Sequence, residues 1–214
     1  MFGYGRPFHQ WLGIEANPIA STTYIGGYGG LRGVLPWADL RVGGRYVQQI
    51  ARSYLGEQSD NEYTRRDTED RVIDGNAHYI ELETELSVSI DAGPGDILAV
   101  ATGTLVVGIP NDQLVYEDLM RVVANAPGFW RGRLGYSIAF DRRHSVNVGA
   151  VAELIGIPGR NAIILRAGLI ASVKLWPNLE VRASFVPALI SPDTLGISGG
   201  DFGNLGVRWS WASE

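Results

Sequence analysis

The chain has 214 residues, a formal net charge of −5 and no cysteine. This length suits a single domain covering residues 1–214. The negative charge gives no electrostatic support for nucleic-acid binding, and the lack of cysteine excludes disulfides and thiolate metal ligands.

Alternating apolar and polar residues predict an all-β fold of about ten antiparallel strands. The predicted strands cover residues 8–17, 22–34, 38–55, 77–91, 96–108, 130–141, 145–155, 162–175, 178–190 and 204–211. The clearest pattern is in 77–91, where Leu82 lies between Glu81 and Glu83. The strand 96–108 is apolar on both faces, so its pattern leaves the register open.

The predicted connections alternate between tight and loose. The tight turns fall at residues 35–37, 92–95, 141–144 and 176–177. The two longest connections are 56–75, whose dense mixed charge predicts a solvated loop, and 109–129. Within 114–126 the apolar residues recur at helical spacing and predict a short helix. An extra strand is the competing interpretation, and with one more strand it would give twelve.

The last predicted strand carries the most specific pattern of the chain. Leu205, Val207, Trp209 and Trp211 share one face because strand side chains alternate. The segment resembles the C-terminal signal that the outer-membrane assembly machinery reads on bacterial outer-membrane β-barrel proteins. The residues that match are Asn204, Gly206, Trp209 and Trp211. Residues 212–214 follow the match, whereas the family usually ends on the aromatic residue.

The resemblance implies a transmembrane, up-and-down β-barrel of the Gram-negative outer membrane, with short periplasmic turns and longer outer loops. The implied partners are the lipid bilayer, lipopolysaccharide and the assembly machinery. Residues 1–10 lack the pattern of a signal peptide, so an exported protein is expected here in mature or recombinant form. A predicted aromatic girdle at one rim consists of Trp37, Trp176, Trp209 and Trp211. A soluble lipocalin-like barrel with inverted faces is the alternative, because alternation alone does not separate the two.

The polar faces of these strands would point into the lumen and carry both signs of charge. Opposite charges in a narrow interior predict a network that fills the lumen. Its predicted members are Arg41, Arg45, Glu81, Glu83, Glu85, Arg133, Glu153, Arg166, Glu180, Arg182 and Arg208. The favoured hypothesis is a largely plugged barrel with a structural, adhesive or partner-docking role in the cell envelope. A narrow, charge-lined, porin-like channel is the alternative.

Catalysis is a more distant alternative. Omptin proteases, which are ten-stranded outer-membrane barrels, use Asp and His residues at the outer rim, and His78 with Asp74 offers one such pair here. His144 with Ser145 lies at a predicted periplasmic turn, and His9 has no apparent partner. No catalytic residue is therefore assigned. Three scattered histidines without cysteine predict neither a metal site nor a cofactor.

The two long connections are the other functional candidates. Loops on a rigid scaffold often carry binding function. We therefore expect 56–75 and 109–129 to be the surfaces that would contact an envelope protein partner.

Overall fold

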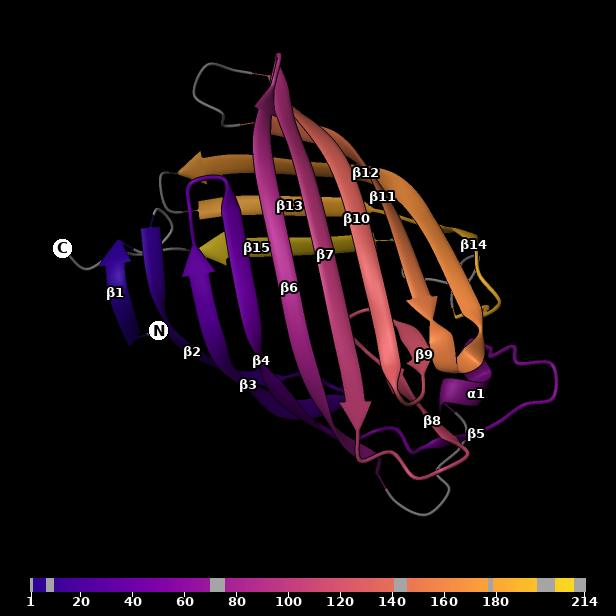
Figure 1. Cartoon of the computed structure of the whole chain (residues 1–214). Helices are drawn as coiled ribbons and strands as arrows, with labels where there is room; N and C mark the ends of the chain where they lie inside the picture. Colours follow the sequence, from indigo (N-terminus) through magenta and orange to yellow (C-terminus); the bar gives the residue numbers. More distant parts are fainter. Residues whose placement is uncertain are drawn as a thin grey trace.

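A computed structural model describes residues 2–6, 10–69, 76–140, 146–176, 179–195 and 203–209. These residues form one large antiparallel sheet of twelve strands and a small three-stranded sheet (Figure 1). The strands of the large sheet are β1 (Phe2–Arg6), β2 (Gln10–Ala20), β3 (Tyr24–Val34), β4 (Ala38–Gln49), β6 (His78–Ala92), β7 (Gly95–Val107), β10 (Gly128–Ala139), β11 (Val146–Ile157), β12 (Ala162–Trp176), β13 (Leu179–Phe185), β14 (Ala188–Ile190) and β15 (Gly203–Trp209).

The all-β, antiparallel prediction is confirmed. The ten predicted strands correspond to β2, β3, β4, β6, β7, β10, β11, β12, β13 with β14, and β15, which pair in chain order. The ninth predicted strand is divided at Pro187, which has no N–H to donate to a ladder. β1 is an unpredicted addition that pairs with the first half of β2.

One predicted break is wrong. The first predicted strand ends at residue 17, but β2 continues to Ala20 and Pro18 lies opposite Gly27 of β3. Beyond Ile14 no other described residue pairs with the free edge of β2. A proline is tolerated on such an edge because the missing N–H breaks no ladder.

The small sheet lies against one face of the large one. It consists of β5 (Leu55–Gly56), β8 (Gln113–Glu117) and β9 (Val122–Ala124). The β8–β9 hairpin, residues 113–124, contacts β4 through Gln49 and β12 through Arg166. The large sheet therefore curves around the hairpin, and in Figure 1 β13 and β15 pass behind β6 and β7. We name the face that contacts the hairpin the concave face.

The predicted helix within 114–126 is wrong. The segment forms strands, as the competing interpretation held, but β8 and β9 belong to the small sheet and add no strand to the large one. Both faces of the hairpin are buried, so its apolar residues do not alternate simply with polar ones. Val115 and Val122 pack into the core shared with the large sheet, while Leu114 and Val123 pack beneath the loops. Burial on two sides produced apolar spacing that resembled a helix.

The two ends of the sheet differ. The tight-turn end carries the short connections at 35–37 and 93–94. The loop end carries the small sheet, α1 (Arg65–Glu69) and η1 (Pro158–Arg160). The segment 56–75 is predicted to be a solvated loop, but part of it is packed against the protein: Tyr63 is buried and residues 65–69 form α1. Residues 70–75 lie outside the described ranges.

The pairing leaves two sheet edges. Within the described ranges it ends at β1 and at β15, and no register joins these two strands into a closed barrel. Successive neighbours are antiparallel throughout, so β15 runs opposite to β2 and in the same direction as β1. None of the described helices is long and apolar enough to cross a membrane.

Candidate functional site

Charge is distributed unequally between the two faces of the large sheet. The convex positions of the described strands from β2 to β13 hold no Asp, Glu, Lys or Arg. Large apolar side chains cover them and are exposed, such as Leu12 at 67 %, Leu134 at 60 % and Leu169 at 59 %. The concave face holds the charged residues, several of which are buried. The apolar and polar faces are thus inverted relative to a water-soluble barrel.

One group of concave charges is rich in carboxylates, and we name it the carboxylate pole. Arg45 of β4 pairs with Glu81 at 3.0 Å, with Glu117 of the hairpin at 3.5 Å and with Glu83. The Glu81 side chain is almost fully buried. Three carboxylates therefore share one guanidinium, with Glu81 and Glu83 supplied by the alternation of β6.

A second group is rich in arginine, and we name it the arginine pole. Glu153 of β11 accepts hydrogen bonds from Arg133 at 2.8 Å and from Arg166 at 3.2 Å. Arg131 lies 3.9 Å from the same carboxylate and donates to Thr102 at 3.1 Å. Three guanidinium groups thus surround one buried carboxylate, because β10 and β12 flank β11 in register.

Further ion pairs extend the arginine pole across the concave face toward β2, β3 and β4. Glu85 lies 3.3 Å from Arg131 and 4.0 Å from Arg41. Arg41 and Arg32 both reach Glu15 of β2, at 3.6 and 3.4 Å. These ion pairs run from β2 to β12, and the ion pairs of the carboxylate pole form a neighbouring cluster on β4, β6 and the hairpin.

The hairpin is held in place by polar contacts at its turn. Asp118 accepts hydrogen bonds from Thr23, Gln49 and Arg52 at 2.8–3.1 Å. Arg166 donates to the carbonyl oxygens of Met120 at 2.8 Å and Arg121 at 3.0 Å. The hairpin thus bridges β4 and β12 from within.

Glu117 is the buried charged residue of the hairpin. The N–H groups of Leu119 and Met120 donate to its carboxylate. Burial nevertheless raises the pKa of Glu117 above its ordinary value, because removal from water penalises the charged form more than these donors and Arg45 favour it.

The structure brings most of the predicted network together. The connected members are Arg41, Arg45, Glu81, Glu83, Glu85, Arg133, Glu153 and Arg166. Glu180 and Arg182 lie nearer the tight-turn end and pair with each other at 2.8 Å. Arg208 occupies the position opposite Glu180 on β15, and its side chain lies outside the described part of the structure.

The prediction missed several members of the network. They are Glu15, Arg32, Arg131, Glu117 and Asp118. The alternation that selected Arg133 also selects Arg131, two residues earlier on the same face. Glu117 had no such signal, since its segment was predicted as a helix.

The predicted aromatic girdle and assembly signal are described only in part. Trp37 and Trp176 are 57 % and 61 % exposed at the tight-turn end; Trp176 lies on the convex side, whereas Trp37 lines a cavity of the concave face. Gly206 lies opposite Arg182. Trp211 and the side chains of Asn204 and Trp209 lie outside the described residues.

The histidine pairs receive no geometric support as catalytic groups. His78 is exposed, its ring lies 6.3 Å from that of Tyr54, and its carbonyl accepts a hydrogen bond from the Tyr54 hydroxyl. Other members of the proposed pairs, Asp74, His144, Ser145 and also His9, lie outside the described residues. Among the residues that are described, no group of three or more His, Cys, Asp or Glu side chains could hold a metal ion.

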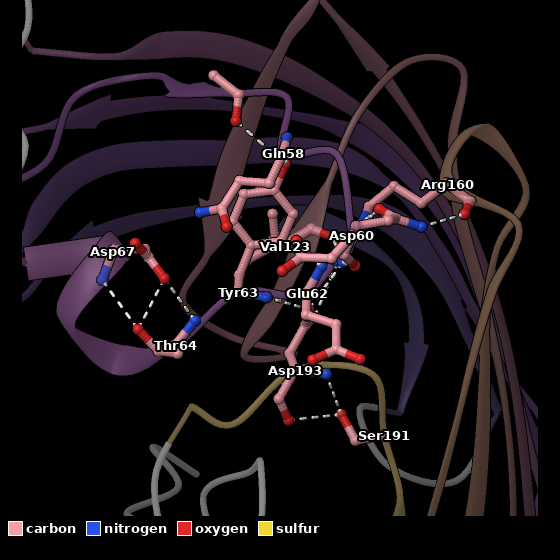
Figure 2. A network of polar contacts seen from close by, with 12 residues as sticks. Gln58, Asp60, Glu62, Tyr63, Thr64, Asp67, Val123, Arg160, Ser191 and Asp193 are labelled. Carbon is pink, nitrogen blue, oxygen red and sulfur yellow. Dashed lines mark hydrogen bonds and ion pairs between the residues drawn. The ribbon is translucent and has the colours of Figure 1, made fainter.

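The loop end has its own buried ion pair, which the sequence did not reveal (Figure 2). Arg160 pairs with both oxygens of Asp193 at 2.7 and 2.8 Å, and both side chains are almost inaccessible to solvent. Arg160 also donates to the carbonyl of Val123 at 2.8 Å and to Asn61, and its guanidinium lies over the Tyr63 ring. These contacts fasten three loops to the hairpin, so the loop end is closed by packing as well as charge.

The tight-turn half of the concave face is open by contrast. Two cavities there have volumes of about 340 and 760 Å³, and a third of about 230 Å³ lies against the hairpin turn. Arg133 lines all three. The arginine pole therefore faces accessible space through Arg133.

Comparison of the chain with protein-family models, curated proteins and solved structures gives no match.

Proposed function

We propose that this chain is a bacterial outer-membrane protein of the β-barrel type, with an interior closed by the hairpin and with a structural or partner-docking role. The observation that carries the proposal is the uncharged convex face, which suits contact with lipid hydrocarbon. Strands of 12–15 residues such as β6, β7, β10, β11 and β12 are long enough, since about 9–11 tilted residues cross a bilayer.

Exposed aromatic side chains at both ends of the convex face support the same proposal. Phe140 and Trp176 lie at the tight-turn end, while Tyr46 and Trp130 lie toward the loop end. Aromatic rings of this kind settle at the two membrane–water interfaces. The uncharged band between them would face the hydrocarbon.

The closed interior is supported by the position of the hairpin. Its buried residues contact apolar side chains from both sides of the curved sheet, including Tyr24 of β3 and Ile164 of β12. A segment packed in this way obstructs the passage of ions. The folded loop end would then present α1, 56–69 and the neighbouring loops as a rigid surface for an envelope partner.

The test is reconstitution into planar lipid bilayers with measurement of single-channel current. We expect stable insertion without current steps. Replacing residues 113–124 by a Gly/Ser linker of equal length should open the interior and produce discrete, salt-dependent steps. A chain that stays soluble without detergent and does not insert would contradict the proposal and favour a lipocalin-like barrel.

A narrow channel is the second candidate. Its specific support is the separation of the carboxylate and arginine poles, which sets an electric field across the interior, together with the cavities that reach the hairpin turn. Current steps from the unmodified chain that change in Glu83→Gln would favour this candidate over the plugged protein.

A further inference from the structure

Arg133 lies where the cavities of the concave face meet. Its side chain is 42 % exposed, although it occupies a concave position on β10. Arg131 and Arg166, which share Glu153 with Arg133, are only 12 % and 7 % exposed. Arg133 is therefore the member of the arginine pole that a solute in these cavities would meet first.

The charge of this region favours an anion. The cavity against the hairpin turn is lined by four arginines, Arg121, Arg131, Arg133 and Arg166, and by two carboxylates, Asp118 and Glu153. Asp118 is already paired with Arg52, at 2.8 Å. Glu153 is shared by Arg131, Arg133 and Arg166, and Arg131 also pairs with Glu85 at 3.3 Å. Three guanidinium groups therefore face two carboxylates, and the charge stays positive.

The arginine pole also retains donors for a further acceptor. The Nε atoms of Arg131 and Arg166 are buried and have no hydrogen-bond partner. Arg133 donates from Nε and from one terminal nitrogen to Glu153, so the other terminal N–H groups of its planar guanidinium fork are the donors for a second carboxylate.

The cavity of about 340 Å³ beside Arg133 is largely apolar. Its concave wall includes Leu98, Val100, Val151 and Ile170. A fully hydrated inorganic anion gains nothing from such a wall, whereas an apolar group is stabilised by leaving water. Small-molecule sites commonly combine an apolar wall with a few polar groups that fix orientation.

We propose that the tight-turn half of the concave face binds a small amphiphilic carboxylate. Its carboxylate pairs with Arg133, and its apolar body lies against Leu98, Val100 and Ile170. The site is a blind pocket, because the hairpin and the loop-end core close its far side. The inference rests on the proposed function in one respect: a bilayer over the convex face leaves the tight-turn end as the entry.

The test is isothermal titration calorimetry of the detergent-solubilised, folded chain with four probes. Benzoate has both the charge and the apolar body, benzamide lacks the charge, and acetate and inorganic phosphate lack the apolar body. We expect benzoate to bind at least about tenfold more tightly than each of the others. Benzamide cannot form the stronger hydrogen bonds between charged groups, and acetate and phosphate gain nothing from the apolar wall. Phosphate binding as tight as that of benzoate would overturn the proposal in favour of a simple oxyanion site.

Matched variants locate the site. Arg133→Gln should remove the preference for benzoate over benzamide, and Arg133→Lys should retain part of it because the charge remains without the fork. Arg41→Gln is the control: its side chain is 39 % exposed on the same concave face, and it does not line the three cavities. Circular dichroism checks that each variant is folded.

Equal weakening of benzoate binding in Arg133→Gln and Arg41→Gln would overturn the proposal, because it would indicate a general effect of charge. The titration needs folded protein but no bilayer. Failure to bind benzoate would therefore contradict the carboxylate site without bearing on membrane insertion. Failure to insert into a bilayer would contradict the proposed function, and the titration could still be interpreted.

Discussion

The concave face is filled in one way at the loop end and in another at the tight-turn end. At the loop end Val122, Val123 and Ile164 are completely buried, and the Arg160–Asp193 pair fastens the loops over them. At the tight-turn end the same face borders the larger cavities. The difference shows that one alternating pattern can build a packed core or an open pocket, depending on whether another segment folds onto it.

The largest expected effect is the loss of stability of the loop end when the Arg160–Asp193 ion pair is removed. Asp193→Asn should lower the free energy of unfolding of the loop end by about 3–5 kcal/mol, because it leaves the buried Arg160 without its counter-charge. Native-state hydrogen exchange of the Val122 and Val123 amides measures the loss. The matched control is Glu180→Gln at the tight-turn end, whose partner Arg182 is 54 % exposed; its cost should stay below about 1 kcal/mol. Equal effects would contradict the contrast between the ends.

The next largest expected effect is the free-energy cost of placing a charge on the convex face of the sheet rather than on the concave face. Leu134→Arg places a charge in the middle of the convex face, where it should cost about 2–4 kcal/mol in a lipid bilayer. Ser89→Arg, an exposed concave position near the tight-turn end, is the control and should insert like the parent. Refolding yield into lipid vesicles as a function of urea concentration gives both values. An unimpaired Leu134→Arg would indicate that the convex face does not meet lipid.

The strands were predictable and the closure of the interior was not. Period-two alternation is set by local sterics, so it located the ten strands and placed Arg45, Glu81 and Glu153 on one face. The hairpin was predicted wrongly because burial on both sides hid its alternation. Arg160 and Asp193 lie in short connections that carry no periodic signal, and only the tertiary fold brings them together.

β1 also could not be predicted from side-chain alternation. Phe2–Arg6 pairs with β2 through backbone hydrogen bonds, for which side-chain alternation over so few residues gives little signal. Charge positions within strands were therefore predictable, whereas contacts between segments distant in sequence were not.

The smallest expected effect concerns the pH dependence of hairpin docking. Burial raises the pKa of Glu117 in the docked hairpin, so the docked state binds a proton more readily than the undocked state. The stability from this proton is complete below the ordinary pKa of a glutamate and is lost as pH rises through the raised pKa. Acidification should therefore tighten docking. Because the chain has no cysteine, a spin label on Leu119→Cys reports hairpin mobility at a single site. Adding Glu117→Gln should weaken the pH dependence, and a hairpin that loosens on acidification in the labelled parent would refute this role of Glu117.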